Sequence, residues 1–290
     1  MSIPMNSVCA ECFFSKRIAL ARKLGTDEQA TELVKILMGQ FANSPADMDS
    51  ALLGGIADAT IYEYFGVDPD QMKEEKAISN RFVLERLDTI RSRIDAAENR
   101  LYAALQFAVL GNYLDFAALA GKVSFEDLDK MLDTYADIDL DKACFRQFRQ
   151  DLEAGKRFLY VTDNAGEICF DRLMAEVIAE LYPNISITFL VRGAPVANDA
   201  TREDAQVAGI RFPVIDNGTA IGGTAISHIC PEAKTALEQA DVILAKGMGN
   251  TESLFGCGYN VYYAFLVKCA RFEQFFNAPH MKPMFIRDKK

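Results

Sequence analysis

The fold is decided by residues 158–191, which read FLYVTDNAGEICFDRLMAEVIAELYPNISITFLV. Two short apolar runs, 158–162 and 185–191, bound this stretch and are typical of strands buried on both faces of a parallel sheet. Between them, Ile168, Leu173 and Val177 recur at helical spacing, which predicts a helix over 167–181. A strand–helix–strand unit of this kind makes a right-handed crossover, so the stretch predicts an α/β fold.

The same pattern continues to the C-terminus. Further apolar runs at 211–215, 242–245 and 261–267 predict more strands, and 231–240 predicts a helix between two of them. These segments together predict an open, doubly wound sheet with mainly parallel strands.

The first half of the chain has a helical pattern almost throughout. The apolar positions from Leu87 to Ala108 recur every three or four residues, which predicts one long helix with one buried face. We therefore expect an all-helical bundle over 1–154 and an α/β domain over 155–290. No flexible linker separates them, so we expect the two halves to pack together.

Composition limits the classes of function. The chain has 290 residues and a formal net charge of −10, which disfavours binding to nucleic acid. Without a signal-like N-terminus or an apolar run of about 18 residues, the sequence predicts no membrane segment and a cytoplasmic location. Of the seven cysteines, Cys9 and Cys12 have a CxxC spacing, which fits either buried structural thiols or a redox or metal role.

Polar residues that directly follow the predicted strands point to a metal. Asp163 and Asn164 follow the first strand, and Asp199 lies in the loop after the second. Ligands of open α/β sheets bind at this edge, where two carboxylates close together repel unless a cation or a proton lies between them. Oxygen ligands favour Mg²⁺ or Mn²⁺ and also accept Co²⁺ or Ni²⁺. The alternative is that both aspartates only cap the following helices.

A third strand end carries the opposite charge. Lys246 is followed by Gly247-Met248-Gly249-Asn250 and a predicted helix start, which places an ammonium beside free backbone N–H groups. Such an arrangement receives phosphate oxygens. The alternative is an ordinary strand-to-helix turn. A glycine-containing loop at 216–224 adds a fourth segment to the same edge.

These motifs resemble those of a known family, the metal-dependent damage-control phosphatases first called domain of unknown function 89. The similar segments are the Asp-Asn-Ala-Gly-Glu run at 163–167, the segments 192–201 and 246–252, and Gly-Asn-Tyr-Leu-Asp at 111–115. The early CxxC resembles the branch that contains stand-alone archaeal and bacterial members. The resemblance spans nearly the whole chain.

The resemblance implies a helical domain before a Rossmann-like, three-layer α/β/α domain. It implies a divalent metal on Asp163, Asn164 and Asp199, and we expect Asp163 and Lys246 to be the catalytic residues. The residues that it implies near the substrate or its phosphate are Asn112, Asp115, Glu167, Met248, Gly249, Asn250, Thr251, Glu252 and Lys268.

We therefore expect a metal-dependent phosphomonoester hydrolase that acts on small phosphorylated metabolites, such as sugar phosphates or damaged phosphorylated cofactors and nucleotides. The nucleophile is either a metal-bound water or Asp163 itself. One alternative is a methyltransferase for small molecules or protein carboxyl groups, which has the same sheet architecture. The other is a nucleotide-binding module without catalysis, although no GxGxxG follows the first strand.

Overall fold

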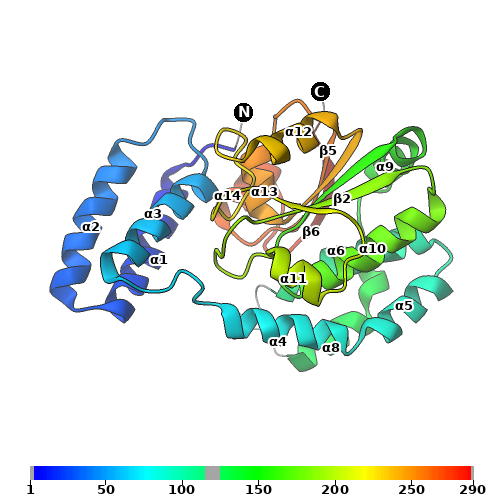
Figure 1. The fold of residues 1–290 in the computed structure, drawn as a ribbon, viewed down its shortest axis with the longest axis horizontal. Helices are drawn as coiled ribbons and strands as arrows, with labels where there is room; N and C mark the ends of the chain where they lie inside the picture. Colours follow the sequence, from blue (N-terminus) through cyan, green and yellow to red (C-terminus); the bar gives the residue numbers. More distant parts are fainter. Residues whose placement is uncertain (1–2, 115–124, 289–290) are drawn as a thin grey trace.

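The computed structural model describes residues 3–114 and 125–288. Its first three helices, α1 (Ser7–Leu24), α2 (Asp27–Ala42) and α3 (Ser50–Phe65), form a lobe at the left of Figure 1. Side chains of Asn6, Thr26 and Asp49 accept hydrogen bonds from backbone N–H groups in the first turns, which fixes where the three helices begin. Their facing sides enclose a separate apolar core.

The remaining helices of the first half are α4 (Lys73–Leu84), α5 (Leu87–Ala96), α6 (Arg100–Gly111), α8 (Phe125–Asp133), the short 3₁₀ turn η1 (Tyr135–Asp137) and α9 (Lys142–Ala154). Among the described residues, two of them, α6 and α9, contact strands of the sheet, and α4, α5 and α8 pack on other helices. The prediction of one long helix from Leu87 to Ala108 is wrong. Ala97 has an extended conformation that ends α5, and the side chain of Asn99 caps α6. The buried stripe itself is present, because Ile94 and Leu101 lie in the same apolar core.

Six strands form one sheet in the order β3-β2-β1-β4-β5-β6. Their bounds are β1 Arg157–Val161, β2 Ser186–Val191, β3 Val214–Asp216, β4 Val242–Lys246, β5 Val261–Leu266 and β6 Pro283–Arg287. All neighbouring pairs are parallel except β5 and β6. The predicted doubly wound, mainly parallel sheet is confirmed. The third strand is shorter than the predicted 211–215, and the antiparallel edge strand β6 was not predicted.

Helices cover both faces of the sheet, as Figure 1 shows. The later helices are α10 (Glu167–Leu181), α11 (Arg202–Val207), α12 (Pro231–Gln239), α13 (Gly247–Leu254) and α14 (Ala270–Phe276). Alternate strand residues enter different cores: Phe158 and Tyr160 pack with α6 and α10, whereas Leu159 and Val161 pack with α12 and α13. This is the three-layer α/β/α arrangement.

The helices that follow α3 in the first half share an apolar core with the sheet, and this core is separate from the core of α1–α3. The core on one side of the sheet contains Ile90, Leu105 and Phe148 together with residues of α10 and the strands. The domain boundary at residue 154, which coincides with the end of α9, stays a prediction. Within the described residues, no helix is both long enough and apolar enough to cross a membrane.

The chain reverses its direction across the sheet next to β1. It runs from β1 through β2 to β3 and then returns to place β4 on the other side of β1. The connections after β1 and β4 therefore diverge, which leaves room at the carboxyl ends of these strands. This is the edge at which the sequence predicts the site.

Candidate functional site

A cleft of about 260 Å³ lies between α3 and the carboxyl edge of the sheet. From the edge of the sheet, its lining includes Asp163, Asn164, Asp199, Met248 and Lys268. The wall contributed by α3 is built from one carboxylate, Asp58, and four small residues. The small residues are Ser50, Ala51, Gly54 and Gly55. The cleft therefore joins segments that lie far apart in the sequence.

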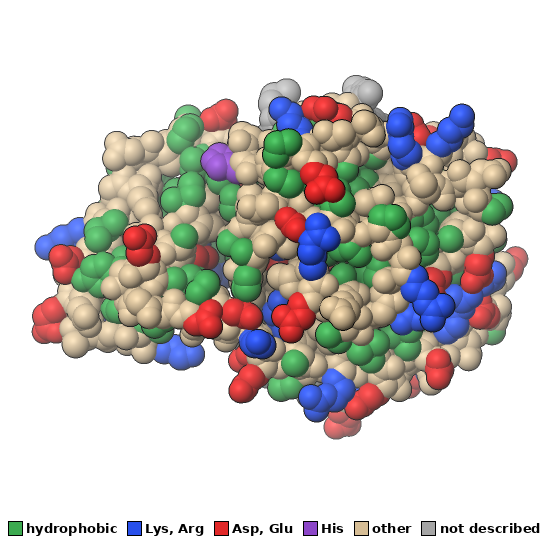
Figure 2. All heavy atoms as spheres, in the orientation of Figure 1, with side chains coloured by type: hydrophobic (Ala, Val, Ile, Leu, Met, Phe, Trp, Pro, Cys, Tyr) green, Lys and Arg blue, Asp and Glu red, His purple; other side chains and the backbone are tan. Residues whose placement is uncertain are grey.

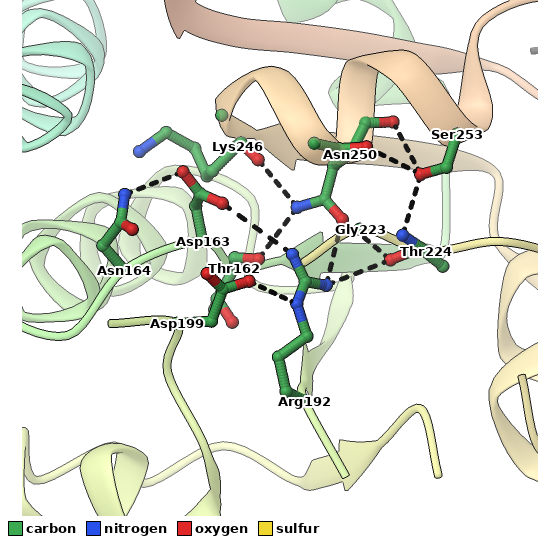
Figure 3. Close-up of polar contacts among 12 residues, drawn as sticks. Thr162, Asp163, Asn164, Arg192, Asp199, Gly223, Thr224, Lys246, Asn250 and Ser253 are labelled. Carbon is green, nitrogen blue, oxygen red and sulfur yellow. Dashed lines mark hydrogen bonds and ion pairs between the residues drawn. The ribbon is translucent and has the colours of Figure 1, made fainter. Parts of the chain in front are cut away.

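The three predicted metal ligands are brought together by pairing between their loops. Asn164 and Asp199 form an antiparallel backbone bridge, and the backbone N–H of Ala200 donates to the carbonyl of Asp163 over 2.7 Å. Their strands β1 and β2 are neighbours, as the sequence argument required. Figure 3 shows the side chains of Asp163, Asn164 and Asp199 next to one another. Both aspartates are nearly buried.

Asp163 lies directly under the start of α13. A Cβ added to Gly247 would lie 1.9 Å from the Oδ2 atom of Asp163, and Gly247 has a φ of +78°. Only glycine meets both conditions. Asn112 and Asn164 each donate a hydrogen bond to Oδ2, over 3.1 and 2.7 Å. Burial, together with the charges of Asp199 and Glu167, raises the pKa of Asp163 well above its ordinary value.

Arg192 is a functional candidate that the sequence argument did not select. Its Nε donates to Asp199 over 2.6 Å, and its Nη2 lies 3.8 Å from Oδ1 of Asp163 (Figure 3). The side chain is buried, and Nη2 forms no hydrogen bond with any described residue. Nη1 donates to the side chain of Asn250. An arginine directly after a buried apolar strand was the available signal, because such a charge needs carboxylate partners.

Lys246 does not line the cleft. It is fully buried, and its ammonium donates to Glu167, Asp171 and the backbone carbonyl of Ala108 over 2.7, 2.9 and 2.7 Å. All three of its N–H donors therefore have protein acceptors. The expectation that Lys246 contacts a phosphate directly does not fit this geometry. Its charge instead stabilises Glu167 from behind the site.

Glu167 and Asn112 connect the helices behind the cleft to the metal-ligand loop. The carboxylate of Glu167 is fully buried and accepts hydrogen bonds from Asn112, Asn164 and Lys246. Contact between Glu167 and a substrate, which the resemblance implied, does not fit this burial. Asn112 lines the cleft and also accepts from the backbone of Leu266, so it joins α6 to β5.

The segment 248–252 divides into two parts. Met248 and Gly249 line the cleft at the first turn of α13. Asn250 and Thr251 are buried, and their side chains donate hydrogen bonds to backbone carbonyls. Glu252 accepts a hydrogen bond from Ser50 over 2.6 Å. The expectation that all five residues line the phosphate is therefore too broad, because successive residues of a helix point in different directions.

Lys268 lines the cleft just after β5, and its predicted contact with a phosphate stays a prediction. Its ammonium donates to the backbone carbonyl of Asn112 over 2.6 Å. The other predicted substrate residue, Asp115, lies outside the described residues.

Arg17 and Asp58 form a second pair that the sequence argument missed. Both line the cleft from the α1–α3 lobe, with the guanidinium 3.1 Å from the carboxylate. Arg17 also donates to the carbonyl of Gly54. Neither residue lies after a strand, so no strand-end pattern in the sequence marks them.

The donor set fits a divalent cation. Among the described residues, no group of three His, Cys, Asp or Glu side chains could hold a metal ion. The predicted ligand set is of a different kind, because it combines two carboxylates with one amide. In the buried cluster around it, four carboxylates face two cations, which leaves two negative charges to be balanced by a cation or by protons. The carboxylates are Asp163, Glu167, Asp171 and Asp199, and the cations are Arg192 and Lys246.

Comparison with known proteins gives consistent matches. The model of the damage-control phosphatase ARMT1-like domain matches residues 5–282. An uncharacterized protein of Methanocaldococcus jannaschii is 32% identical, with 92% of this chain and 90% of that protein covered. A damage-control phosphatase of Archaeoglobus fulgidus is 30% identical, with 86% and 87% covered. The crystal structure of a DUF89 family protein of Pyrococcus horikoshii has the same fold, with a TM-score of 0.85, 24% identity and 99% of both chains covered.

Proposed function

The chain belongs to the family of damage-control phosphatase ARMT1-like domains, and from this premise we propose that its cleft hydrolyses phosphomonoesters of small metabolites with the help of a divalent metal. The observation that carries the proposal is the convergence of Asp163, Asn164 and Asp199 in a cleft of about 260 Å³. This volume suits a compact phosphorylated molecule and leaves little room for a macromolecule.

The proposed metal ligands are the carboxylates of Asp163 and Asp199 and the amide oxygen of Asn164. Both hydrogen bonds found for the Asn164 side chain are donated by its nitrogen, to Asp163 and to Glu167, which orients the amide and keeps the oxygen for a cation. Mg²⁺, Mn²⁺, Co²⁺ and Ni²⁺ all accept such oxygen donors. A bound metal would polarise a phosphoryl oxygen and supply an activated water.

Protein groups beside the metal ligands would receive the phosphate. The first turn of α13 presents backbone N–H groups at Met248 and Gly249, where the helix dipole favours an anion. Lys268 adds a positive charge at the rim. This arrangement stabilises negative charge on the phosphoryl oxygens during transfer.

Arg192 has a supporting role in this proposal. Its guanidinium pairs with Asp199 and lies close to Asp163, so it holds both carboxylates in place while the cluster carries excess negative charge. Asn250 holds the guanidinium from the other side. Arg192 thus fixes the spacing of the two carboxylates before any ligand enters.

The proposal is tested with a panel of sugar phosphates and phosphorylated cofactors, assayed for phosphate release in the presence of Mn²⁺. We expect Asp163→Ala and Asp199→Ala to lose at least about a hundredfold in kcat, because each removes a ligand from the metal. Lys268→Met should mainly raise KM, since Lys268 lies at the rim. Retention of full activity by both aspartate variants would refute the assignment of the metal ligands.

A further inference from the structure

A buried polar network behind the cleft joins helix α4 to both metal-ligand loops. Its centre is Asn80, whose side chain is 2% exposed. The Oδ1 of Asn80 accepts from the backbone N–H of Gly166 over 2.6 Å, and its Nδ2 donates to Oδ1 of Asp204 over 3.0 Å. Gly166 ends the loop that carries Asp163 and Asn164. The amide of Asn80 therefore has one partner on each side.

Asp204 extends the network to the second loop. Its Oδ2 accepts from the ammonium of Lys76 over 2.7 Å and from both the backbone N–H and the hydroxyl of Thr201 over 2.9 Å. Thr201 follows Asp199 by two residues. Asp204 and Lys76 are both nearly buried. The two partners of the Asn80 amide fix its orientation, because the N–H of Gly166 needs an acceptor and the carboxylate of Asp204 needs a donor.

The turn at Gly166 explains why this support is needed. Gly166 has a φ of +77°, and a Cβ at this position would lie 2.9 Å from the Cβ of Ser79. The loop is therefore pressed against α4 in a conformation that most residues avoid. Without Asn80, the buried N–H of Gly166 would lose its acceptor, which is unfavourable. Helix α4 thus holds the turn from outside the sheet.

We infer that Asn80 and Asp204 are positioning residues that set the distance between the loop of Asp163 and Asn164 and the loop of Asp199. This inference rests on the metal ligands of the proposed function. Neither residue touches the cleft. Their effect on a metal is indirect, through the backbone of Gly166 on one side and of Thr201 on the other.

A charge swap tests the inference. Asn80→Asp places a second carboxylate against Asp204. Asp204→Asn leaves one amide oxygen to accept from Asn80, Thr201 and Lys76 together, where the carboxylate used one oxygen for Asn80 and the other for Thr201 and Lys76. The double variant N80D/D204N restores one donor and one acceptor between the two positions and keeps the net charge. We expect each single variant to raise the Kd for Mn²⁺ at least about tenfold, and the Kd of the double variant to return close to that of the wild type. Calorimetric titration of Mn²⁺ into the full chain, after a chelator has removed its metal, measures this Kd.

Two further measurements distinguish a positioning role from a general loss of folded structure. In the metal-free protein, amide hydrogen exchange at residues 163–168 should become faster in each single variant and return to the wild-type rate in the double variant. Asn260→Ala is the matched control, because Asn260 bonds to Asp151 and Asp241 at the start of β5, at the opposite edge of the sheet. It should leave the Kd for Mn²⁺ unchanged.

The inference is overturned if the single variants bind Mn²⁺ like the wild type, if the double variant is as weak as the single ones, or if Asn260→Ala weakens binding equally. A wild-type protein that binds no Mn²⁺ would refute the proposed metal site instead. In that case the exchange rates still decide: unchanged exchange at 163–168 in the single variants overturns the inference, and faster exchange that the double variant reverses supports it.

Discussion

At the scale of residues, two lysines that the sequence suggested for the same role have opposite surroundings. Lys268 lies at the rim of the cleft, whereas Lys246 is enclosed by Glu167, Asp171 and the end of α6. Strand geometry explains the difference. Lys246 ends β4 with the same parity as Val242 and Leu244, which face α6 and α10, so its side chain points to that covered face. This alternation was present in the sequence.

Removal of the Lys246 charge should destabilise the fold. Lys246→Met leaves Glu167 and Asp171 buried without their cation, which we expect to lower the free energy of unfolding by about 3–5 kcal/mol. Urea denaturation at neutral pH measures this loss. The matched variant Lys268→Met should change the free energy of unfolding by about 1 kcal/mol or less, because the side chain of Lys268 is only half-buried, where water screens its charge. Equal stability of the two variants would contradict the different roles.

At the scale of elements, short-range sequence patterns predicted those helices and strands whose residues carry a clear apolar periodicity. The helix predicted over 167–181 is α10 itself, and the strands β1, β2 and β4 agree within one residue. Strand β6 was missed because it begins at a proline and is held only by antiparallel pairing to β5. The break between α5 and α6 was missed because Asn99 caps a helix inside an unbroken apolar stripe.

The contact between α13 and the loop of Asp163 gives the sharpest prediction at this scale. Gly247→Ala brings a methyl group into the Asp163 carboxylate, so we expect loss of Mn²⁺ binding and of phosphate release. Gly258→Ala is the matched control, because Gly258 also has a positive φ, +85°, but no atom lies within 4 Å of its added Cβ. It should lose about 1–3 kcal/mol from backbone strain alone and keep the Kd for Mn²⁺.

Stability and metal affinity are therefore to be measured on both glycine variants. If Gly258→Ala and Gly247→Ala lower metal affinity to the same extent, backbone strain would account for both effects. The close approach of α13 to Asp163 would then have no specific role.

At the scale of the whole molecule, the cleft exists because the α1–α3 lobe packs against the edge of the sheet (Figure 1). The sequence predicted the edge but not Arg17, Asp58 or the small residues of α3, because packing between distant segments leaves no local pattern. On the face drawn in Figure 2, acidic and basic side chains are interspersed. Among the described residues, neither sign of charge forms a continuous patch on this face.

The lobe and the sheet are joined by Glu252 of α13, which accepts from Ser50 of α3. Burial, opposed by this hydrogen bond, raises the pKa of Glu252 from 4.5 to about 7. A raised pKa means that the folded state binds the proton more tightly, so this contribution to stability is complete below pH 4.5 and is lost as the pH rises through 7.

Glu252→Gln removes this titration. We expect the variant to gain stability relative to the wild type between pH 5 and pH 8, by on the order of 1–3 kcal/mol. Denaturation of both proteins across this range measures the difference. A difference that does not vary with pH would show that Glu252 does not titrate in this range.

The central claim is that the cleft hydrolyses phosphomonoesters with a divalent metal on Asp163, Asn164 and Asp199. The most direct measurement is phosphate release from a sugar phosphate by protein whose metal has been removed with a chelator, before and after Mn²⁺ is added back. We expect no release after chelation, recovery with added Mn²⁺, and no recovery in Asp199→Ala. Release that continues at the same rate after complete removal of metal would contradict this claim.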